Sequence, residues 1–279
     1  MHPIEIICQG GGYVSANKPG GLPTQAPVQH ASLQAFLRNQ LCLDRADYLE
    51  AVHRLDRPVS GVVLFATSKK SARLLSEQFA SRLVKKAYLA VVEGDPFDNP
   101  IDQRDDRIAN GSDGERCWND WVAKIPDHPE VRVVEEGATG AKQATTFVRV
   151  LAYDTDTNRS LVRLRPATGR MHQLRVQLSA RGAPIVGDIR YGAESTLSDI
   201  AVLRGGPVKP AAELGAEKAD RGEANDGYPA SIALHAESLE FRDPKTASWV
   251  LATAPWGFDD PARWQQSRSS ELRPGQEDG

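Results

Sequence analysis

The chain has 279 residues, of which 40% are hydrophobic and 25% are charged, and its net charge is −3. This length and composition predict a globular protein with one large domain or two small ones. No run of about 18 apolar residues occurs, so a membrane-spanning helix is not expected, and the N-terminus lacks the pattern of a signal peptide. Three scattered cysteines without CxxC spacing favour a reducing, cytoplasmic compartment and argue against a disulfide framework or a zinc site.

The first part of the sequence predicts three strands and two helices. Loose alternation that ends in the turn NKPGG is typical of a strand. Ser32 and Ser68 each precede apolar residues at helical spacing, which is the position of an N-cap residue. The apolar run GVVLFAT predicts a buried strand, and KAYLAVVEG alternates as a strand does. In chain order these segments are residues 4–18, 33–41, 61–67, 69–83 and 86–94.

The remaining sequence predicts further strands, one helix and two insertions. The strands ATTFVRVLAY and SLVRLRP flank the turn DTDTN, and SIALHAESLEF and SWVLATAP flank the turn RDPKT. The helix MHQLRVQLSARG ends at Gly182, a favourable residue after a helix. Irregular insertions are expected at residues 95–140 and 203–228. The sum is an α+β fold with a mixed, largely antiparallel central sheet and flanking helices, in one domain over residues 1–264 before a disordered tail, 265–279.

The small net charge conceals three segments of opposite sign. Residues 53–86 carry eight basic and two acidic side chains, and residues 159–190 carry seven arginines and one aspartate, so each segment has a charge of +6. Residues 95–136 carry five bases and twelve acids, a charge of −7. Two basic segments on one face would attract phosphate, with the acidic segment elsewhere. Solvated helix faces are the alternative interpretation.

The stretch HRLDRPVSG places an aspartate between two arginines, directly before the apolar strand. Opposite charges favour the ionised carboxylate, so Asp56 between Arg54 and Arg57 is expected to stay charged at neutral pH. A carboxylate held in this way can act as a nucleophile or as a base. The alternative is a structural ion pair that fixes the turn.

A second polar stretch, RPATGRMHQLRVQL, carries an arginine-rich helix start. Thr168 has the position of an N-cap, and the first-turn amides behind it favour an anion. His172, Arg175 and Ser179 share one predicted helix face, while Met171, Leu174 and Leu178 form the buried face. Arg170 at the helix start can reach a phosphate or a carboxylate. A solvated helix face explains the same pattern.

Tyr88 lies on a predicted strand just after Lys85 and Lys86. An aromatic ring beside basic residues can stack on a nucleic-acid base, although a single tyrosine on a strand more often belongs to the core. Other chemistries lack their motifs. No HxxxH or HExxH pattern suggests a metal, no P-loop or GxGxxG suggests a nucleotide cofactor, and no GxSxG suggests a serine hydrolase.

Taken together, these pieces resemble the RluA-type pseudouridine synthases. That family combines a His-Arg-Leu-Asp segment leading through Ser-Gly into an apolar strand, a lysine–tyrosine strand, a Thr-Gly-Arg-x-His-Gln-Leu-Arg helix, a Gly-Asp-x-x-Tyr-Gly turn and a Leu-His-Ala strand. The matching stretches are HRLDRPVSGVVLFATS, KKAYLAVVEG, TGRMHQLRVQL, GDIRYG and LHAESLEF, with SANKPGGLPTQ similar to the family's opening turn. Order and spacing agree over residues 4–255.

The resemblance implies a single-domain, monomeric isomerase that converts a uridine in structured ribosomal or transfer RNA to pseudouridine, in a central cleft and without cofactor or metal. It implies that Asp56 is the essential catalytic residue, that Tyr88 lies against the uracil, and that Arg170 pairs with the aspartate. Arg54 matches the position that holds the place of the flipped-out uridine or its phosphate. The further residues expected to bind RNA are Arg57, Lys85, Lys86, His172 and Arg175.

Two other functions remain open at this point. A catalytically idle RNA-binding module would share the fold, but the presence of Asp56 counts against it. A hydrolase or glycosidase with an aspartate nucleophile would need a second acid close to Asp56, and no motif supplies one convincingly.

Overall fold

The structure is a computed structural model that describes residues 3–27, 29–44, 46–98, 114–198 and 231–256. Within this part of the chain, eleven strands form one sheet. The elements are β1 (Ile6–Gly10), β2 (Tyr13–Lys18), α1 (Leu33–Gln40), β3 (Glu50–Ala51), β4 (Ser60–Ala66), α2 (Lys69–Ala80), β5 (Lys85–Glu93), β6 (Arg116–Lys124), β7 (Val131–Val134), β8 (Lys142–Asp154), β9 (Arg159–Pro166), α3 (Gln173–Ala180), β10 (Leu234–Arg242) and β11 (Trp249–Thr253).

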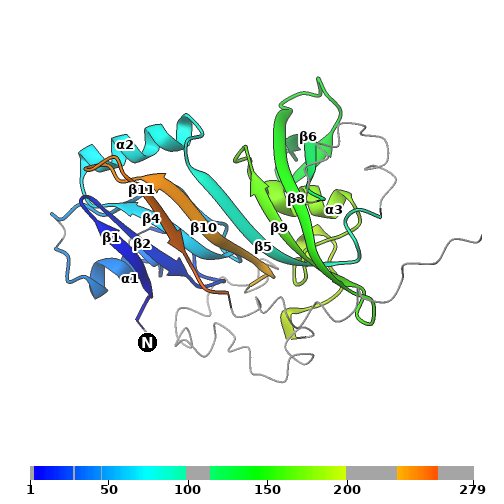
Figure 1. Cartoon of the computed structure of the whole chain (residues 1–279), viewed down its shortest axis with the longest axis horizontal. Coiled ribbons are helices and arrows are strands. Elements are labelled where there is room, and N and C mark those ends of the chain that lie inside the picture. The colour runs from blue at the N-terminus through cyan, green and yellow to red at the C-terminus, as the bar shows by residue number, and fades with distance from the viewer. Residues whose placement is uncertain (1–2, 28, 45, 99–113, 199–230, 257–279) are drawn as a thin grey trace, which may run out of the picture.

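The sheet has the order β1-β2-β4-β10-β5-β9-β8-β6-β7, with β11 beside β10 and β3 beside β4. Of the strand pairs described, β4 with β10 is parallel and the others are antiparallel. This confirms the predicted α+β fold with a mixed, largely antiparallel sheet. Figure 1 shows β5 between two halves, one with α1 and α2 and the other with α3.

Local sequence explains why the first two helices begin where they do. The Ser32 hydroxyl accepts a hydrogen bond from the Ala35 amide, and Ser68 does the same for Ser71, so both predicted N-caps are confirmed. Leu37 of α1 and Leu75 of α2 are fully buried in two separate apolar clusters. The two helices therefore anchor the half of the sheet that contains β4.

Two predicted segments differ from the structure. Residues 4–18 form a hairpin of β1 and β2 rather than one strand, because Gly12 takes a positive φ of 112° that permits the tight turn. Residues 95–140 were expected to be irregular, but β6 and β7 lie within them. The insertion at 203–228, the domain end at 264 and the tail at 265–279 lie outside the described residues.

Gly61 allows β4 and β10 to approach each other in parallel. It has a φ of 113°, and a Cβ atom built there would lie 2.3 Å from the carbonyl oxygen of Ala236 on β10. Residues that have a side chain rarely adopt this backbone conformation, and a Cβ atom cannot lie 2.3 Å from a carbonyl oxygen. Gly61 after the polar loop is thus required by the neighbouring strand.

Gly61→Ala is expected to lower the free energy of unfolding by about 3 kcal/mol or more, because backbone strain and a clash with β10 add. Denaturant unfolding measures the change. Gly137→Ala is the matched control, since Gly137 also has a positive φ, of 85°, but has no atom within 4 Å of the added Cβ. Equal losses in the two variants would show that the close approach of β10 does not restrict this position.

Candidate active site

A cleft of about 650 Å³ opens between the two halves of the sheet. Its walls come from the loop before β4, the end of α2, β5, and the segment from the end of β9 into α3. Pockets of this size hold drug-sized ligands, and a single nucleotide is of that class. The titratable side chains in its lining are His53, Arg54, Asp56, Arg82, Lys86, Tyr88, Arg170, His172 and Arg175.

The loop that carries Asp56 is tied to the turn after β2. The Thr24 hydroxyl accepts from the Leu55 amide and donates to the Leu55 carbonyl, each at 3.2 Å. Lys18 is fully buried, and its ammonium group donates to the carbonyls of Pro19, Leu22 and Arg57 at 3.0, 2.7 and 3.1 Å. The segment of residues 17–24, NKPGGLPT, therefore holds the residues on both sides of Asp56.

Lys18 gives the stability of the fold a specific pH dependence. Burial lowers the pKa of its ammonium group from 10.5 to about 7, with the charge of Asp56 acting in the opposite direction. Between these two values the unfolded chain binds more protons than the folded chain, so this contribution to stability rises with pH by at most about 1.4 kcal/mol per unit. Wild-type protein is expected to gain stability over Lys18→Met from pH 7 to pH 9.5.

Denaturant unfolding at several pH values measures this difference, with Lys124→Met as the control for loss of an exposed lysine. Parallel curves for wild type and Lys18→Met would mean that the three carbonyl acceptors keep the lysine charged throughout this range.

Asp56 faces two donors from the other wall of the cleft. Arg175 Nη1 lies 3.6 Å and His172 Nε2 lies 3.8 Å from Oδ2 of the carboxylate, whose side chain is 35% exposed. The guanidinium of Arg175 is 1% exposed and binds Asp188 through Nε and Nη2, at 2.6 and 2.7 Å. Its Nη1 has no hydrogen-bond partner among the described residues and is directed at Asp56. A nearby guanidinium favours the ionised carboxylate.

The partner of Asp56 in the structure is therefore Arg175, and the prediction that Arg170 fills this role is wrong. Arg170 lines the cleft, but its Nε donates to the carbonyl of Gln143 at 2.9 Å. The physical reason is where the helix begins. α3 starts at Gln173 and not at residue 169, so Arg175 in its first turn is the arginine that points at the carboxylate.

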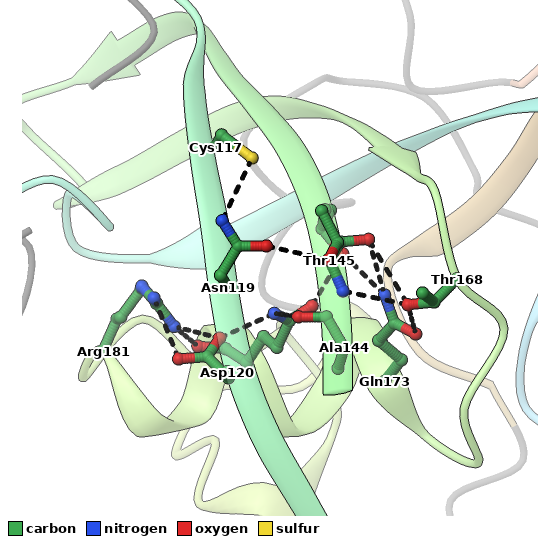
Figure 2. A network of polar contacts seen from close by, with 10 residues as sticks. Cys117, Asn119, Asp120, Ala144, Thr145, Thr168, Gln173 and Arg181 are labelled. Atoms are coloured by element: carbon green, nitrogen blue, oxygen red, sulfur yellow. Dashed lines mark hydrogen bonds and ion pairs between the residues drawn. The ribbon is translucent and has the colours of Figure 1, made fainter. Parts of the chain in front are cut away.

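Gln173 explains this late start, and Thr168 is not the N-cap that was predicted. The Gln173 side chain accepts from the Thr168 hydroxyl at 2.7 Å and from the Arg170 amide at 3.0 Å. Its amide nitrogen donates to Thr145 and Thr146 on β8. Figure 2 shows Thr168 and Gln173 directed together at the backbone of Thr145. This buried network fixes the segment that presents Arg170 and His172 to the cleft.

The predicted helix faces are also different in the structure. Residues 173–178 of α3 are all buried, whereas Met171, expected in the core, is 43% exposed at the cleft wall. Polar side chains on the covered side are satisfied by partners, as Gln177 is by Asp120 and Thr146. An arginine-rich helix start that looks solvated by its composition is thus packed into the molecule.

Tyr88 on β5 lines the cleft. Burial raises the pKa of its phenol above the ordinary value of 10, and the charge of Asp56 acts in the same direction. The phenol is therefore neutral at physiological pH and lies close enough to Asp56 to feel its charge. An apolar ring with a neutral hydroxyl suits contact with a flat, uncharged ligand.

Basic residues gather at the cleft, but fewer than predicted. Arg54, Arg82 and Lys86 line it, and none forms an ion pair with an acidic group in the described part of the chain. Two predicted RNA-binding residues lie outside the lining. Arg57 donates to the carbonyl of Gly21, and Lys85 pairs with Glu240.

The acidic segment does not lie apart from the basic ones. Its acids pair with arginines of residues 159–190 that do not line the cleft, in the pairs Arg165–Glu115, Arg181–Asp120 and Arg190–Glu130. These pairs neutralise the arginines that have no place in the cleft. The positive charge left over is thereby concentrated around Asp56.

His53 also lines the cleft, although the motifs did not predict it as a site residue. Its Nε2 accepts the Leu64 amide at 3.0 Å, and its ring stacks on Phe79. Burial lowers the pKa of His53 to about 3, and the charge of Lys86 acts in the same direction, so the imidazole is neutral.

Arg82 lines the cleft but was not predicted as a site residue. Arg82 has a φ of 59° where the chain turns after α2, and no glycine or asparagine in the sequence marks this turn.

Among the described residues, no group of three or more His, Cys, Asp or Glu side chains is arranged to hold a metal ion. The prediction of no metal stays a prediction. No helix in this described part of the chain has the length and apolar character needed to cross a membrane.

Comparisons with known proteins agree with this geometry. A family model described as RNA pseudouridylate synthase matches residues 12–180, which include both walls of the cleft. The chain belongs to this family. It is an RNA pseudouridine synthase, an isomerase that converts uridine in RNA to pseudouridine, as the motifs predicted.

The chain is similar to curated members of the family over most of its length. It is 31% identical over 272 residues to the tRNA pseudouridine synthase C of Haemophilus influenzae, covering 94% of this chain and 95% of the relative. It is also 31% identical over 259 residues to the dual-specificity RNA pseudouridine synthase RluA of Pasteurella multocida, covering 91% and 94%. The solved structure of human RNA pseudouridylate synthase domain containing 4 is 24% identical, covers 92% of this chain and 91% of its own, and has a TM-score of 0.63, which supports the fold.

Proposed function

We propose that this pseudouridine synthase acts on a uridine in structured transfer or ribosomal RNA, and that Asp56 is its essential catalytic residue. The observation that supports this is a cleft for one nucleotide in which Asp56 is the only carboxylate among the described lining residues. A glycosidase would need a second acid across the same space. The proposed pairing of the aspartate is with Arg175 in place of Arg170.

The isomerisation breaks the bond between N1 of uracil and C1′ of the ribose and joins C5 to C1′. The C5 hydrogen leaves as a proton and N1 gains one, so the reaction balances without an oxidant or a reductant. Asp56 acts either as a nucleophile on the ribose or as a base that removes a ribose proton, and both roles need the charged carboxylate. Tyr88 lies against the uracil while the base rotates.

RNA binding is proposed to follow from the unpaired cations. A base inside a helix must be extruded to reach a pocket, at a cost of about a few kcal/mol. Phosphate contacts from Arg54, Arg82 and Lys86 at the cleft, and from Arg170 on the opposite wall, offset part of this cost. Arg57 and Lys85 lie outside the cleft lining, so their contacts with RNA would be to nucleotides beyond the flipped one.

The test is a map of pseudouridines in cellular RNA from cells with the wild-type gene, without it, and with an Asp56→Asn copy. One or more sites are expected to be lost in both deficient strains. Transfer RNA is the first substrate to examine, because a relative covering nearly the whole chain is named a tRNA pseudouridine synthase. An unchanged map in all RNA classes would refute the substrate assignment.

We further propose that the enzyme is a cytoplasmic monomer. The three cysteines form no disulfide and fit a reducing compartment. Light scattering of the purified protein is expected to give the mass of one chain, and with RNA the mass of one chain plus one RNA. Fractionation of cells is expected to place the protein with cytoplasmic markers.

A further inference from the structure

His172 has a left-handed backbone conformation. Its φ is 49° and its ψ is 24°, a region that only a few per cent of residues other than glycine occupy, with asparagine, aspartate and histidine enriched among them. Its ring is 9% exposed and forms part of the cleft wall. A left-handed residue in a cleft wall keeps this conformation because the contacts of its side chain hold it there.

Both nitrogens of the ring face polar groups. Nδ1 lies 2.9 Å from the hydroxyl of Tyr191, which also accepts the Val131 amide at 3.1 Å. The Nε2 side of the ring faces the Asp56 carboxylate, which can only accept a hydrogen bond, so Nδ1 is left as the acceptor for the phenol hydrogen. A neutral imidazole then carries its own hydrogen on Nε2, the nitrogen 3.8 Å from Asp56 Oδ2.

Both members of this pair are neutral at physiological pH. Burial lowers the pKa of His172, with the charge of Asp56 acting in the opposite direction. Burial also raises the pKa of Tyr191 to about 12. The groups that face them are Asp56, Arg175, Asp188, Arg190 and Glu130. Asp56 and Asp188 favour the protonated imidazole, whereas Arg175 and Arg190 oppose it. These charges therefore do not force a second proton onto the ring.

We propose that Tyr191 and His172 are a positioning pair for the carboxylate of Asp56. Tyr191 fixes the ring and its tautomer, and the Nε2–H of His172 and the Nη1 of Arg175 both hold Oδ2. Oδ1 is thereby left to act on the ribose. The proposal rests on the catalytic role proposed for Asp56, and it makes His172 a group that acts through Asp56 instead of an RNA ligand.

Two features distinguish this arrangement from ordinary packing. The two donors come to the same oxygen, at 3.6 and 3.8 Å, and active-site contacts of this length in a free enzyme shorten when substrate binds. The second donor is also neutral, so it orients the carboxylate without adding charge that would hold the group back from reaction. A carboxylate held through one oxygen keeps a defined direction for the other.

The test compares two conservative variants of His172. Glutamine can place its amide N–H near the position of Nε2, toward Asp56, whereas asparagine reaches only the position of Nδ1, toward Tyr191. His172→Gln is expected to lower kcat on RNA by no more than about 10-fold and His172→Asn by about 100-fold, with KM within twofold of wild type in both. Asparagine tolerates the left-handed backbone better, so a purely structural role predicts the reverse order, and that order would overturn the proposal.

Tyr191→Phe supplies a second, independent measurement. It is expected to lower kcat about 5-fold in the wild-type background and to have no effect in a His172→Ala background, because the tyrosine acts through the histidine. Tyr153→Phe, which removes an exposed hydroxyl that donates to Asn158, is the matched control. Additive losses in the double variant would contradict the pairing. Absence of activity in the wild-type enzyme on every RNA tested would instead refute the proposed function.

Discussion

Asp56→Asn is expected to abolish pseudouridine formation, with a loss of about 10³-fold or more in kcat, while RNA affinity stays the same or rises. The amide can neither attack the ribose nor accept its proton, so the main chemical group is lost. Affinity does not fall, because removing the only carboxylate among the described lining residues makes the cleft more positive toward phosphate. Arg175 keeps its bond to Asp188, so the fold is expected to be retained.

Release of tritium from RNA that carries 5-tritiated uridine measures turnover, because the C5 hydrogen leaves during isomerisation. Fluorescence anisotropy with labelled RNA measures binding. Asp156→Asn is the matched control, since it makes the same change of charge at an exposed turn. Turnover above a tenth of the wild-type value in Asp56→Asn would remove the essential role from this residue.

Much of the fold is predictable because it depends on local sequence. Ser32 and Ser68 are caps within one turn of the amides that they bind, and GVVLFAT is a strand because it is apolar throughout. β6 was missed because its alternation is masked by polar residues that find partners far along the chain. Asp120 of this strand is satisfied by Gln177 and Arg181, more than fifty residues away.

The candidate site was predictable in part because its residues lie in short local motifs. The order of the motifs places Asp56, Tyr88 and a basic helix start in one family, and the structure brings all three to one cleft. The register of the helix start was not predictable, since it depends on the buried side chain of Gln173 bonding to β8. The assignment of Arg170 as the partner of Asp56 failed on that register alone.

Charge distribution had a similar limit. The segment charges predicted a positive surface, and a positive cleft exists, but most arginines of residues 159–190 are used elsewhere. Arg165 and Arg181 pair with acids of the negative segment, and Arg163 pairs with Glu237 of β10. A sum over sequence cannot tell a neutralised arginine from a free one, because pairing depends on which strands become neighbours.

Arg175 provides the second large effect, on stability and activity together. Arg175→Met leaves the fully buried Asp188 without its partner, and breaking a buried pair in this way is expected to cost about 3–5 kcal/mol of unfolding free energy. Turnover is expected to fall by about 100-fold or more, because Nη1 no longer faces Asp56. Calorimetry and tritium release measure the two quantities.

The double variant Arg175→Met/Asp188→Leu separates these two effects. Replacing both members of a buried pair by apolar residues is expected to return stability to within about 1 kcal/mol of wild type. Activity is expected to stay low, since the donor to the carboxylate is still missing. Arg181→Met, which breaks the pair with Asp120 at the end of the same helix, is expected to lose stability but retain turnover at temperatures where it is folded. Recovery of activity in the double variant would mean that Arg175 contributes only to the stability of the fold. Asp56 would then be active without a guanidinium beside it, because the double variant has none at this position.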